Sequence, residues 1–327
     1  MATYQGIKGR TVQNLASDPP AAVGEGQVWY NTASDVLKVS VGVGAWASGG
    51  NMGTARYQIG GAGTTNTAAI GFTGHSPSPP VGTSALTEEY DGTSWSAGGA
   101  YPKISNGLGY EHIGSLTAAL GASGASTPST VTAEYNGSSW TAGGSCTIGA
   151  NLRGGIGTQT AALLIGGRTD PGPPYGRVDV EEYDGDSWTA ANNLTASKRR
   201  AGAIGTTSAA VTFGGDPGTQ TSFNYDGTSW TAGNGTLTAR GYGGGSAGIQ
   251  TNGITYGGGS PRITTTETYD GTSWSAGTAM GTARYAGCCW GLATDCGMGG
   301  GSPTPGSVTN ITEEYSLVGT IQTITST

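Results

Sequence analysis

Short apolar runs alternate with turn-forming residues along most of this chain of 327 residues. The segments 161–165 and 209–213 are two such runs, and each is followed by a pair of glycines. Apolar runs of this length that end in glycine favour buried β-strands. After a variable loop a segment such as Thr-Glu-Glu-Tyr follows, and then Asp-Gly or Asn-Gly, which is a strong signal for a two-residue hairpin turn. The pattern predicts an all-β chain in which a unit of four strands recurs.

One phrase marks every unit: a tyrosine ends the third strand, and a tryptophan begins the fourth five residues later. The tyrosines recur every 42 to 48 residues, a period typical of four-stranded propeller blades. We expect these rings to pack between neighbouring blades and to be structural. The repeat residues are Tyr90, Trp95, Tyr135, Trp140, Tyr183, Trp188, Tyr225, Trp230, Tyr269 and Trp274, with Tyr315 and Trp46 as the separated last pair.

The last repeat is split between the two ends of the chain. Tyr315 has no tryptophan after it, whereas Trp46 precedes the first repeat. We therefore expect residues 37–48 to form the outer strand of a blade built from 283–318, which closes a ring of six blades and leaves no exposed edge.

The repeat resembles the kelch family, on the glycine pair after the second strand, the tyrosine of the third and the tryptophan of the fourth. The resemblance covers about residues 37–320 and implies a kelch-like six-bladed β-propeller. Residues 1–36 then form an N-terminal arm with a small β-element, and 321–327 a C-terminal tail.

The expected blade topology places the uniform turns on one face and the variable, proline-rich loops on the other. Stiff, variable loops on a rigid scaffold are usual places for recognition. Tolerated insertions are the alternative explanation. The candidate recognition residues are Pro77, Pro79, Pro80, Pro128, Pro173, Pro174, Tyr175, Pro303 and Pro305.

The segment 26–32 with 36–39 resembles a phrase common in tail-fibre and other virion proteins of bacteriophages, and the repeated Tyr-Asp-Gly-Thr-Ser-Trp phrase is similar to that of predicted phage structural proteins. This resemblance implies a non-enzymatic virion protein of the tail, fibre, baseplate or capsid, present in multiple copies. Its N-terminal arm would dock on other virion proteins, with Trp29 and Tyr30 as candidate anchors, and its loops would contact the host surface or a glycan. The alternative is a free-standing carbohydrate-binding adhesin, or lectin-like module.

Composition removes several classes of function. The net charge is −7, only 11% of residues are charged, and the arginines are scattered, so the electrostatic footprint of a nucleic-acid-binding protein is missing. No apolar run reaches the roughly 20 residues that span a bilayer, and the N-terminus lacks the pattern of a signal peptide. We expect synthesis in a host cytoplasm and assembly into a virion. Four cysteines are present, and either Cys288 or Cys289 could pair with Cys296, or all could be buried thiols.

Candidate chemistry is sparse. Copper radical oxidases, which are kelch relatives, need two histidines near tyrosine and cysteine, but His75 and His112 fall in different repeats. We expect no cofactor and no metal, and the sequence shows no phosphate-binding loop or catalytic triad.

A sialidase, which is also a six-bladed propeller, needs three arginines around a carboxylate. Arg56, Arg153, Arg240 and Arg284 could converge near the axis, but they recur once per repeat, which favours a structural role. The acidic pairs at 88–89, 181–182 and 313–314 lie on third strands, where neighbours point to opposite faces. We expect one member of each pair to form an ion pair or hydrogen bond within its blade. The sequence therefore favours a protein that is not an enzyme.

Overall fold

The computed structural model describes residues 12–19, 27–76, 82–103, 108, 111–124, 129–169, 176–216 and 218–324. All regular secondary structure in these residues is β-strand, which confirms the expected all-β class. The chain divides into a larger unit, Trp46–Tyr315, and a smaller unit made of Met1–Ala45 and Ser316–Thr327. These unit boundaries lie at 45/46 and 315/316, whereas the sequence placed the domain boundaries at 36/37 and 320/321.

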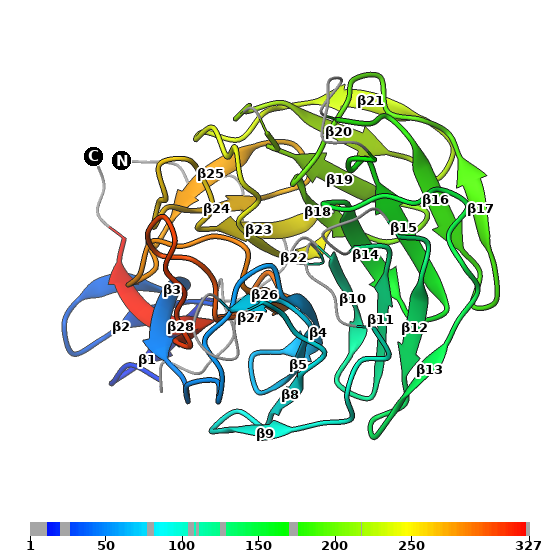
Figure 1. The fold of residues 1–327 in the computed structure, drawn as a ribbon. Coiled ribbons are helices and arrows are strands. Elements are labelled where there is room, and N and C mark those ends of the chain that lie inside the picture. The colour runs from blue at the N-terminus through cyan, green and yellow to red at the C-terminus, as the bar shows by residue number, and fades with distance from the viewer. Residues whose placement is uncertain are drawn as a thin grey trace. The chain divides into compact units, whose positions relative to one another are not determined.

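The larger unit contains consecutive antiparallel groups of strands (Figure 1). The first three groups are β4 (Gly60–Thr65), β5 (Ala68–Phe72), β8 (Thr87–Tyr90) and β9 (Trp95–Ala97); β10 (Glu111–Ser115), β11 (Ala118–Ala122), β12 (Thr132–Tyr135) and β13 (Trp140–Ala142); and β14 (Gly154–Thr158), β15 (Ala161–Ile165), β16 (Val180–Tyr183) and β17 (Trp188–Ala191). The next two are β18 (Gly202–Gly205), β19 (Ala210–Phe213), β20 (Ser222–Tyr225) and β21 (Trp230–Gly233); and β22 (Gly245–Ile249), β23 (Asn252–Tyr256), β24 (Thr266–Tyr269) and β25 (Trp274–Gly277).

The last group is assembled from both ends of the chain. Its strand order is β26 (Cys288–Leu292), β27 (Asp295–Gly299), β28 (Thr312–Thr323) and β3 (Val36–Ser48). Within the larger unit, the Gly49 amide directly after β3 donates a hydrogen bond to the Thr312 carbonyl, with an N···O distance of 3.0 Å. A short hairpin of β6 (His75–Ser76) and β7 (Gly82–Thr83) lies outside these groups.

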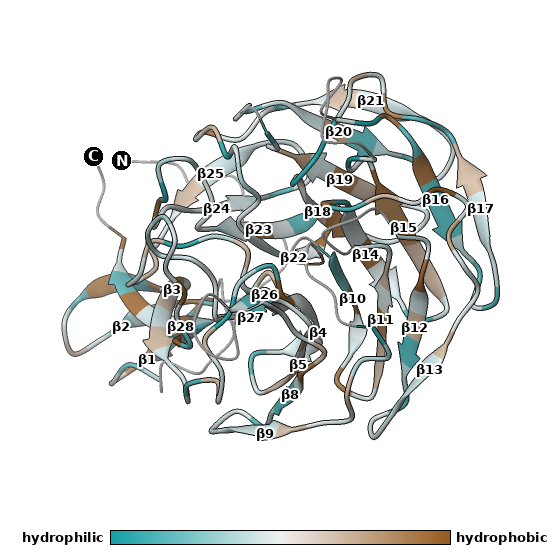
Figure 2. Cartoon of the chain, viewed as in Figure 1, coloured by the Kyte–Doolittle hydropathy of each residue, from teal (hydrophilic) through white to brown (hydrophobic). Residues whose placement is uncertain are grey.

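The first strands of the groups surround a common centre (Figure 1). In chain order, β4 contacts β10, β10 contacts β14, β14 contacts β18, β18 contacts β22, β22 contacts β26, and β26 contacts β4. Glycine and alanine predominate in β4, β14, β18 and β22, which allows close approach of neighbouring backbones. Hydrophobic residues continue into second strands such as β15 (Figure 2), so the core of each group lies between it and its neighbours.

The repeated phrase forms a tight hairpin whose loop is longer than expected. Tyr90 pairs with Trp95 across β8 and β9, so four residues form the turn, not two. The Asp91 side chain accepts hydrogen bonds from the amides of Thr93 and Ser94 at 2.8 and 2.7 Å. Gly92 has a φ of 90°, which favours glycine, and the other repeats reproduce this turn. The aspartate therefore specifies an Asx-type turn that packs the two rings against each other, with centroids 5.0 Å apart.

The smaller unit contains β1 (Gln13–Leu15), which pairs in parallel with β2 (Val28–Asn31), and β2, which pairs antiparallel with β3. Its centre is a polar cluster around Asp18. The carboxylate accepts hydrogen bonds from the Trp29 indole at 3.2 Å and from the Asn31 amide, and it forms an ion pair with Lys38 at 2.6 Å. These contacts hold the strands of a unit in which Trp29 is the buried hydrophobic residue among the described residues.

Candidate functional site

Buried arginine–glutamate pairs recur in the larger unit. Arg56 is buried and donates to Glu88 of the same strand group at 2.9 Å, as Arg240 does to Glu267. The pairs Arg153–Glu181 and Arg284–Glu313 are equivalent. The prediction that one member of each acidic pair is bound within its group is confirmed for Glu88, Glu181 and Glu313. The arginines do not converge on an open site, because each guanidinium is enclosed by its own glutamate and by backbone carbonyls.

The glutamate that directly precedes the tyrosine of one group accepts a hydrogen bond from the tyrosine of the next group. Tyr135 donates to Glu89, Tyr183 to Glu134, and Tyr90 to Glu314. The tryptophans follow the same rule with threonine as acceptor: the indoles of Trp140 and Trp188 donate to Thr87 and Thr132 at 3.0 and 2.9 Å. The repeat residues therefore join neighbouring groups through polar as well as aromatic contacts.

Two groups depart from the arginine–glutamate rule. The second has Ala133 at the glutamate position of β12, and Glu111 of β10 is fully buried instead. The Glu111 carboxyl accepts from the Ala122 amide at 3.1 Å and from the Ser123 hydroxyl at 3.2 Å, and burial raises its pKa to about 8. The fourth group has Phe223 at that position, and Lys198 donates to the carbonyls of Gly214 and Thr221, while burial lowers its pKa to about 8. The side chains of Glu111 and Lys198 are thus both buried and hydrogen-bonded within their own strand groups.

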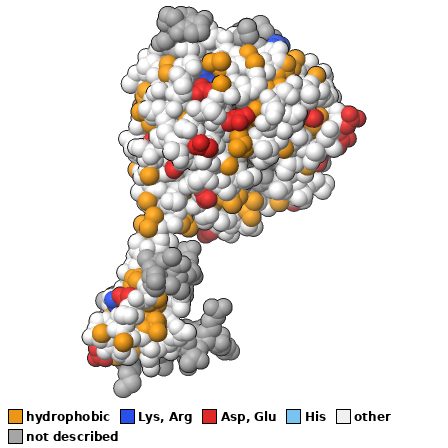
Figure 3. All heavy atoms as spheres, turned by 90° about the horizontal axis from the view of Figure 1, so that it is seen from below, with side chains coloured by type: hydrophobic (Ala, Val, Ile, Leu, Met, Phe, Trp, Pro, Cys, Tyr) orange, Lys and Arg blue, Asp and Glu red, His pale blue; other side chains and the backbone are white. Residues whose placement is uncertain are grey.

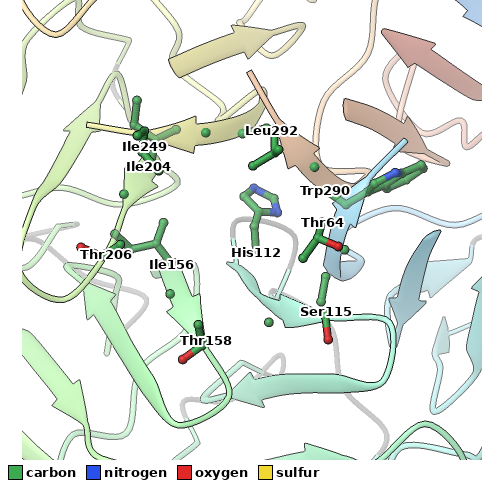
Figure 4. A pocket seen from close by; sticks show the side chains of 18 of the residues that line it. Thr64, His112, Ser115, Ile156, Thr158, Ile204, Thr206, Ile249, Trp290 and Leu292 are labelled. Carbon is green, nitrogen blue, oxygen red and sulfur yellow. The ribbon is translucent and has the colours of Figure 1, made fainter. Parts of the chain in front are cut away.

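A cavity of about 490 Å³ lies at the centre of the larger unit, where the first strands end in their short turns. All six first strands, β4, β10, β14, β18, β22 and β26, contribute to its wall (Figure 4). This end carries the uniform turns, whereas recognition was expected at the opposite face, so the sequence did not reveal the cavity. The signal in the sequence was the residue that follows a glycine at or near the end of each first strand.

Equivalent positions of the six strands line this cavity. Each of them directly follows a glycine with positive φ. Four carry hydroxyl groups and two carry aliphatic side chains. They are Thr64, Ser115, Thr158, Thr206, Ile249 and Leu292.

His112 projects from β10 toward the middle of the cavity, beside Leu292, Thr64 and Ser115 (Figure 4). Both ring nitrogens are buried without a hydrogen bond of normal geometry among the described residues. Burial lowers the pKa of His112 to about 4, and the nearby Cys289 backbone opposes this shift only in part. The imidazole is therefore neutral at physiological pH, with one N–H donor and one nitrogen acceptor.

Most of the predicted recognition residues lie outside the described residues, namely Pro77, Pro79, Pro80, Pro128, Pro173, Pro174 and Tyr175. Pro303 is half-buried and Pro305 is exposed, in the loop between β27 and β28. Of the candidate anchors, Trp29 is fully buried in the smaller unit and Tyr30 is half-buried. Tyr30 donates a hydrogen bond to Asp35.

The histidines and cysteines of the described ranges lie apart from one another or in the core. No three His, Cys, Asp or Glu residues there are grouped so that they could hold a metal ion. All four cysteines are free and buried, and burial raises the pKa of Cys146 and Cys288 to about 12. His75 contacts Tyr57, with ring centroids 5.4 Å apart, and lies on β6, outside the cavity.

The face in Figure 3 shows scattered acidic side chains and no cluster of basic ones. The described ranges contain no helix that is long and apolar enough to cross a membrane.

No family model matches this chain, and no curated protein matches its sequence. Among solved structures, that of YjhT is similar, with a TM-score of 0.64 at 13% sequence identity. The match covers 83% of this chain and 99% of YjhT. At this identity the likeness concerns the fold alone. With the many small antiparallel sheets, it shows that the chain has a β-propeller-like fold.

Proposed function

We propose that the larger unit is a six-bladed, kelch-like propeller closed by the strand at 37–48. The support is the environment of Trp46, whose indole donates to Thr266 at 3.2 Å and to the Thr278 carbonyl at 3.0 Å. Its ring packs on Tyr315 with centroids 5.3 Å apart. The other five tryptophans pack in the same way on the tyrosine across their own hairpin, at 4.7–5.0 Å. Trp46 therefore takes the place of the tryptophan missing after Tyr315.

We propose that this propeller is a non-enzymatic structural protein of a bacteriophage virion. It would act as a rigid platform in the tail, a fibre, the baseplate or the capsid, present in multiple copies and contacting the host surface through its long loops. The observation that carries the proposal is the division of the chain. Both ends, 1–45 and 316–327, belong to one small β-unit, which leaves the larger unit uninterrupted. Such an arrangement suits a docking element that holds a platform by both ends of its chain.

The absence of catalytic activity is part of the same proposal. A glycosidase of the sialidase type needs arginines that can hold a substrate carboxylate. Arg56, Arg153, Arg240 and Arg284 are at most 1% exposed, and each is paired with a glutamate. This supports a role in folding for all four.

The decisive experiment is immunogold labelling of purified phage particles with antibody against residues 50–315, together with a copy-number measurement by quantitative mass spectrometry. Label on tails or capsid vertices is the expected result, and absence from the particle would refute the proposal. A chain lacking residues 1–35 tests docking. We expect its larger unit to fold and its incorporation to fail, whereas the point variant Tyr225→Phe should be incorporated normally.

A free-standing carbohydrate-binding adhesin is the second candidate, favoured by the uncharged central cavity. It predicts that the isolated chain binds a glycan, that deletion of residues 1–36 leaves this binding intact, and that labelling is found on cells or in solution.

A further inference from the structure

The mouth of the central cavity has an apolar side and a hydroxyl-bearing side. Ile249 and Leu292 come from the neighbouring strands β22 and β26, and each is 49% exposed. Exposed aliphatic side chains at adjacent equivalent positions leave apolar surface in contact with water, which a bound molecule would cover. The remaining four equivalent positions carry the hydroxyl groups of Thr64, Ser115, Thr158 and Thr206 (Figure 4).

The cavity has no charge with which to hold an ion. No described residue of its lining is Asp, Glu, Lys or Arg. His112 is neutral above about pH 4, as its lowered pKa indicates. A charged ligand would lose hydration here without gaining a counter-charge, which is costly. The ligand class that the lining supports is therefore uncharged.

The volume of about 490 Å³ lies within the range of roughly 300–1,000 Å³ typical of small-molecule sites. Hydroxyl groups and a neutral imidazole both donate and accept hydrogen bonds, as a polyol requires. The side chains of Ile249 and Leu292 can in turn pack against a ligand face made of C–H groups. We propose that this cavity binds one neutral hexopyranose ring, with its C–H face on Ile249 and Leu292 and its hydroxyls toward the threonine and serine side chains and His112. The proposal concerns the end of the first strands that carries their short turns, and it does not depend on whether the chain belongs to a virion.

The test is ¹³C-methyl NMR of the full chain titrated with methyl glycosides of glucose, galactose and mannose. We expect at least one of them to shift the Ile249 and Leu292 methyl signals saturably. Glucuronate, the charged counterpart of glucose, should bind at least 10-fold more weakly. Cyclohexanol tests the apolar side of the mouth alone, because it has a C–H face but lacks most of the hydroxyls of a hexoside. Equal affinity for glucuronate, shifts with cyclohexanol alone, or no shift with any hexoside would overturn the proposal.

Substitutions at exposed positions test binding without disturbing the core, so that a loss of binding is not a loss of folding. Ile249→Ser should weaken hexoside binding at least 10-fold, and Thr158→Val, which removes a hydroxyl at nearly constant shape, at least 3-fold. Leu237→Ser is the matched control, because Leu237 is 54% exposed and lies outside the cavity lining. All three variants should melt like the parent chain. Equal binding by Ile249→Ser and Leu237→Ser would place any sugar elsewhere and refute this site, whatever the result of particle labelling.

Discussion

Tyr90 donates a hydrogen bond to Glu314, although the two residues are 224 positions apart in the chain. The bond joins the first strand group to the last in the way that Tyr183 and Glu134 join two consecutive groups. Burial, followed by the Glu314 carboxylate, raises the pKa of Tyr90, so the phenol stays protonated and remains a donor. The contact that closes the cycle therefore uses the same chemistry as the contacts along it.

Tyr90→Phe should lower the free energy of unfolding by about 1–2 kcal/mol, because it removes a hydrogen bond to a charged acceptor while the ring stays packed. Urea denaturation is the measurement, and Tyr183→Phe should lose a similar amount. Tyr225→Phe is the control, since no bond from Tyr225 to a carboxylate is found among the described residues. If Tyr90→Phe leaves the free energy of unfolding unchanged while Tyr183→Phe lowers it, the first and last groups are not joined by this bond in solution.

Trp46→Ala should destabilise the larger unit by roughly 3–5 kcal/mol, the usual cost of truncating a packed tryptophan. The indole bridges Tyr256 and Tyr315 and donates two hydrogen bonds. Thermal unfolding followed by near-UV circular dichroism measures the loss, and Trp95→Ala gives the reference for an internal repeat. If Trp46→Ala melts like the parent chain while Trp95→Ala does not, the closure by the N-terminal strand is wrong.

The sequence predicted the aromatic and acidic framework because those residues recur at fixed positions. It did not predict which residue partners Glu89 or Glu314, because a strand pattern assigns faces and leaves the contacts between neighbouring sheets undetermined. Glu111 and Lys198 were missed for a related reason: each occupies a repeat in which the usual glutamate is replaced, by Ala133 or Phe223. The cavity was missed because its lining depends on single residues after glycines, which resemble ordinary turn residues until six strands are brought together.

Arg284→Met should cost roughly 3–5 kcal/mol, because it leaves the Glu313 carboxylate buried without its cation. The double variant Arg284→Met/Glu313→Met should recover part of this loss, since no uncompensated charge then remains. Arg177→Met is a matched control at the partly exposed pair Arg177–Asp179, where we expect a change within about 1 kcal/mol. Urea midpoints for the four chains measure these differences. An Arg284→Met variant as stable as Arg177→Met would contradict a structural role for the buried pairs.

Glu111 should make the stability of the larger unit depend on pH. Its carboxyl is protonated in the folded protein up to about pH 8, whereas in the unfolded chain it ionises near its ordinary pKa of 4.5. The folded state therefore binds more protons between these values, and the contribution of Glu111 is complete below pH 4.5 and is lost as pH rises to 8. Glu111→Gln keeps the neutral shape and removes the titration. We expect this variant to match the parent at pH 5 and to exceed it by roughly 2–4 kcal/mol at pH 9. Urea unfolding at both pH values measures the difference, with Glu182→Gln, at a half-buried glutamate, as the control. Equal gains at pH 5 and pH 9 would show that the effect of Glu111→Gln comes from packing and not from the proton.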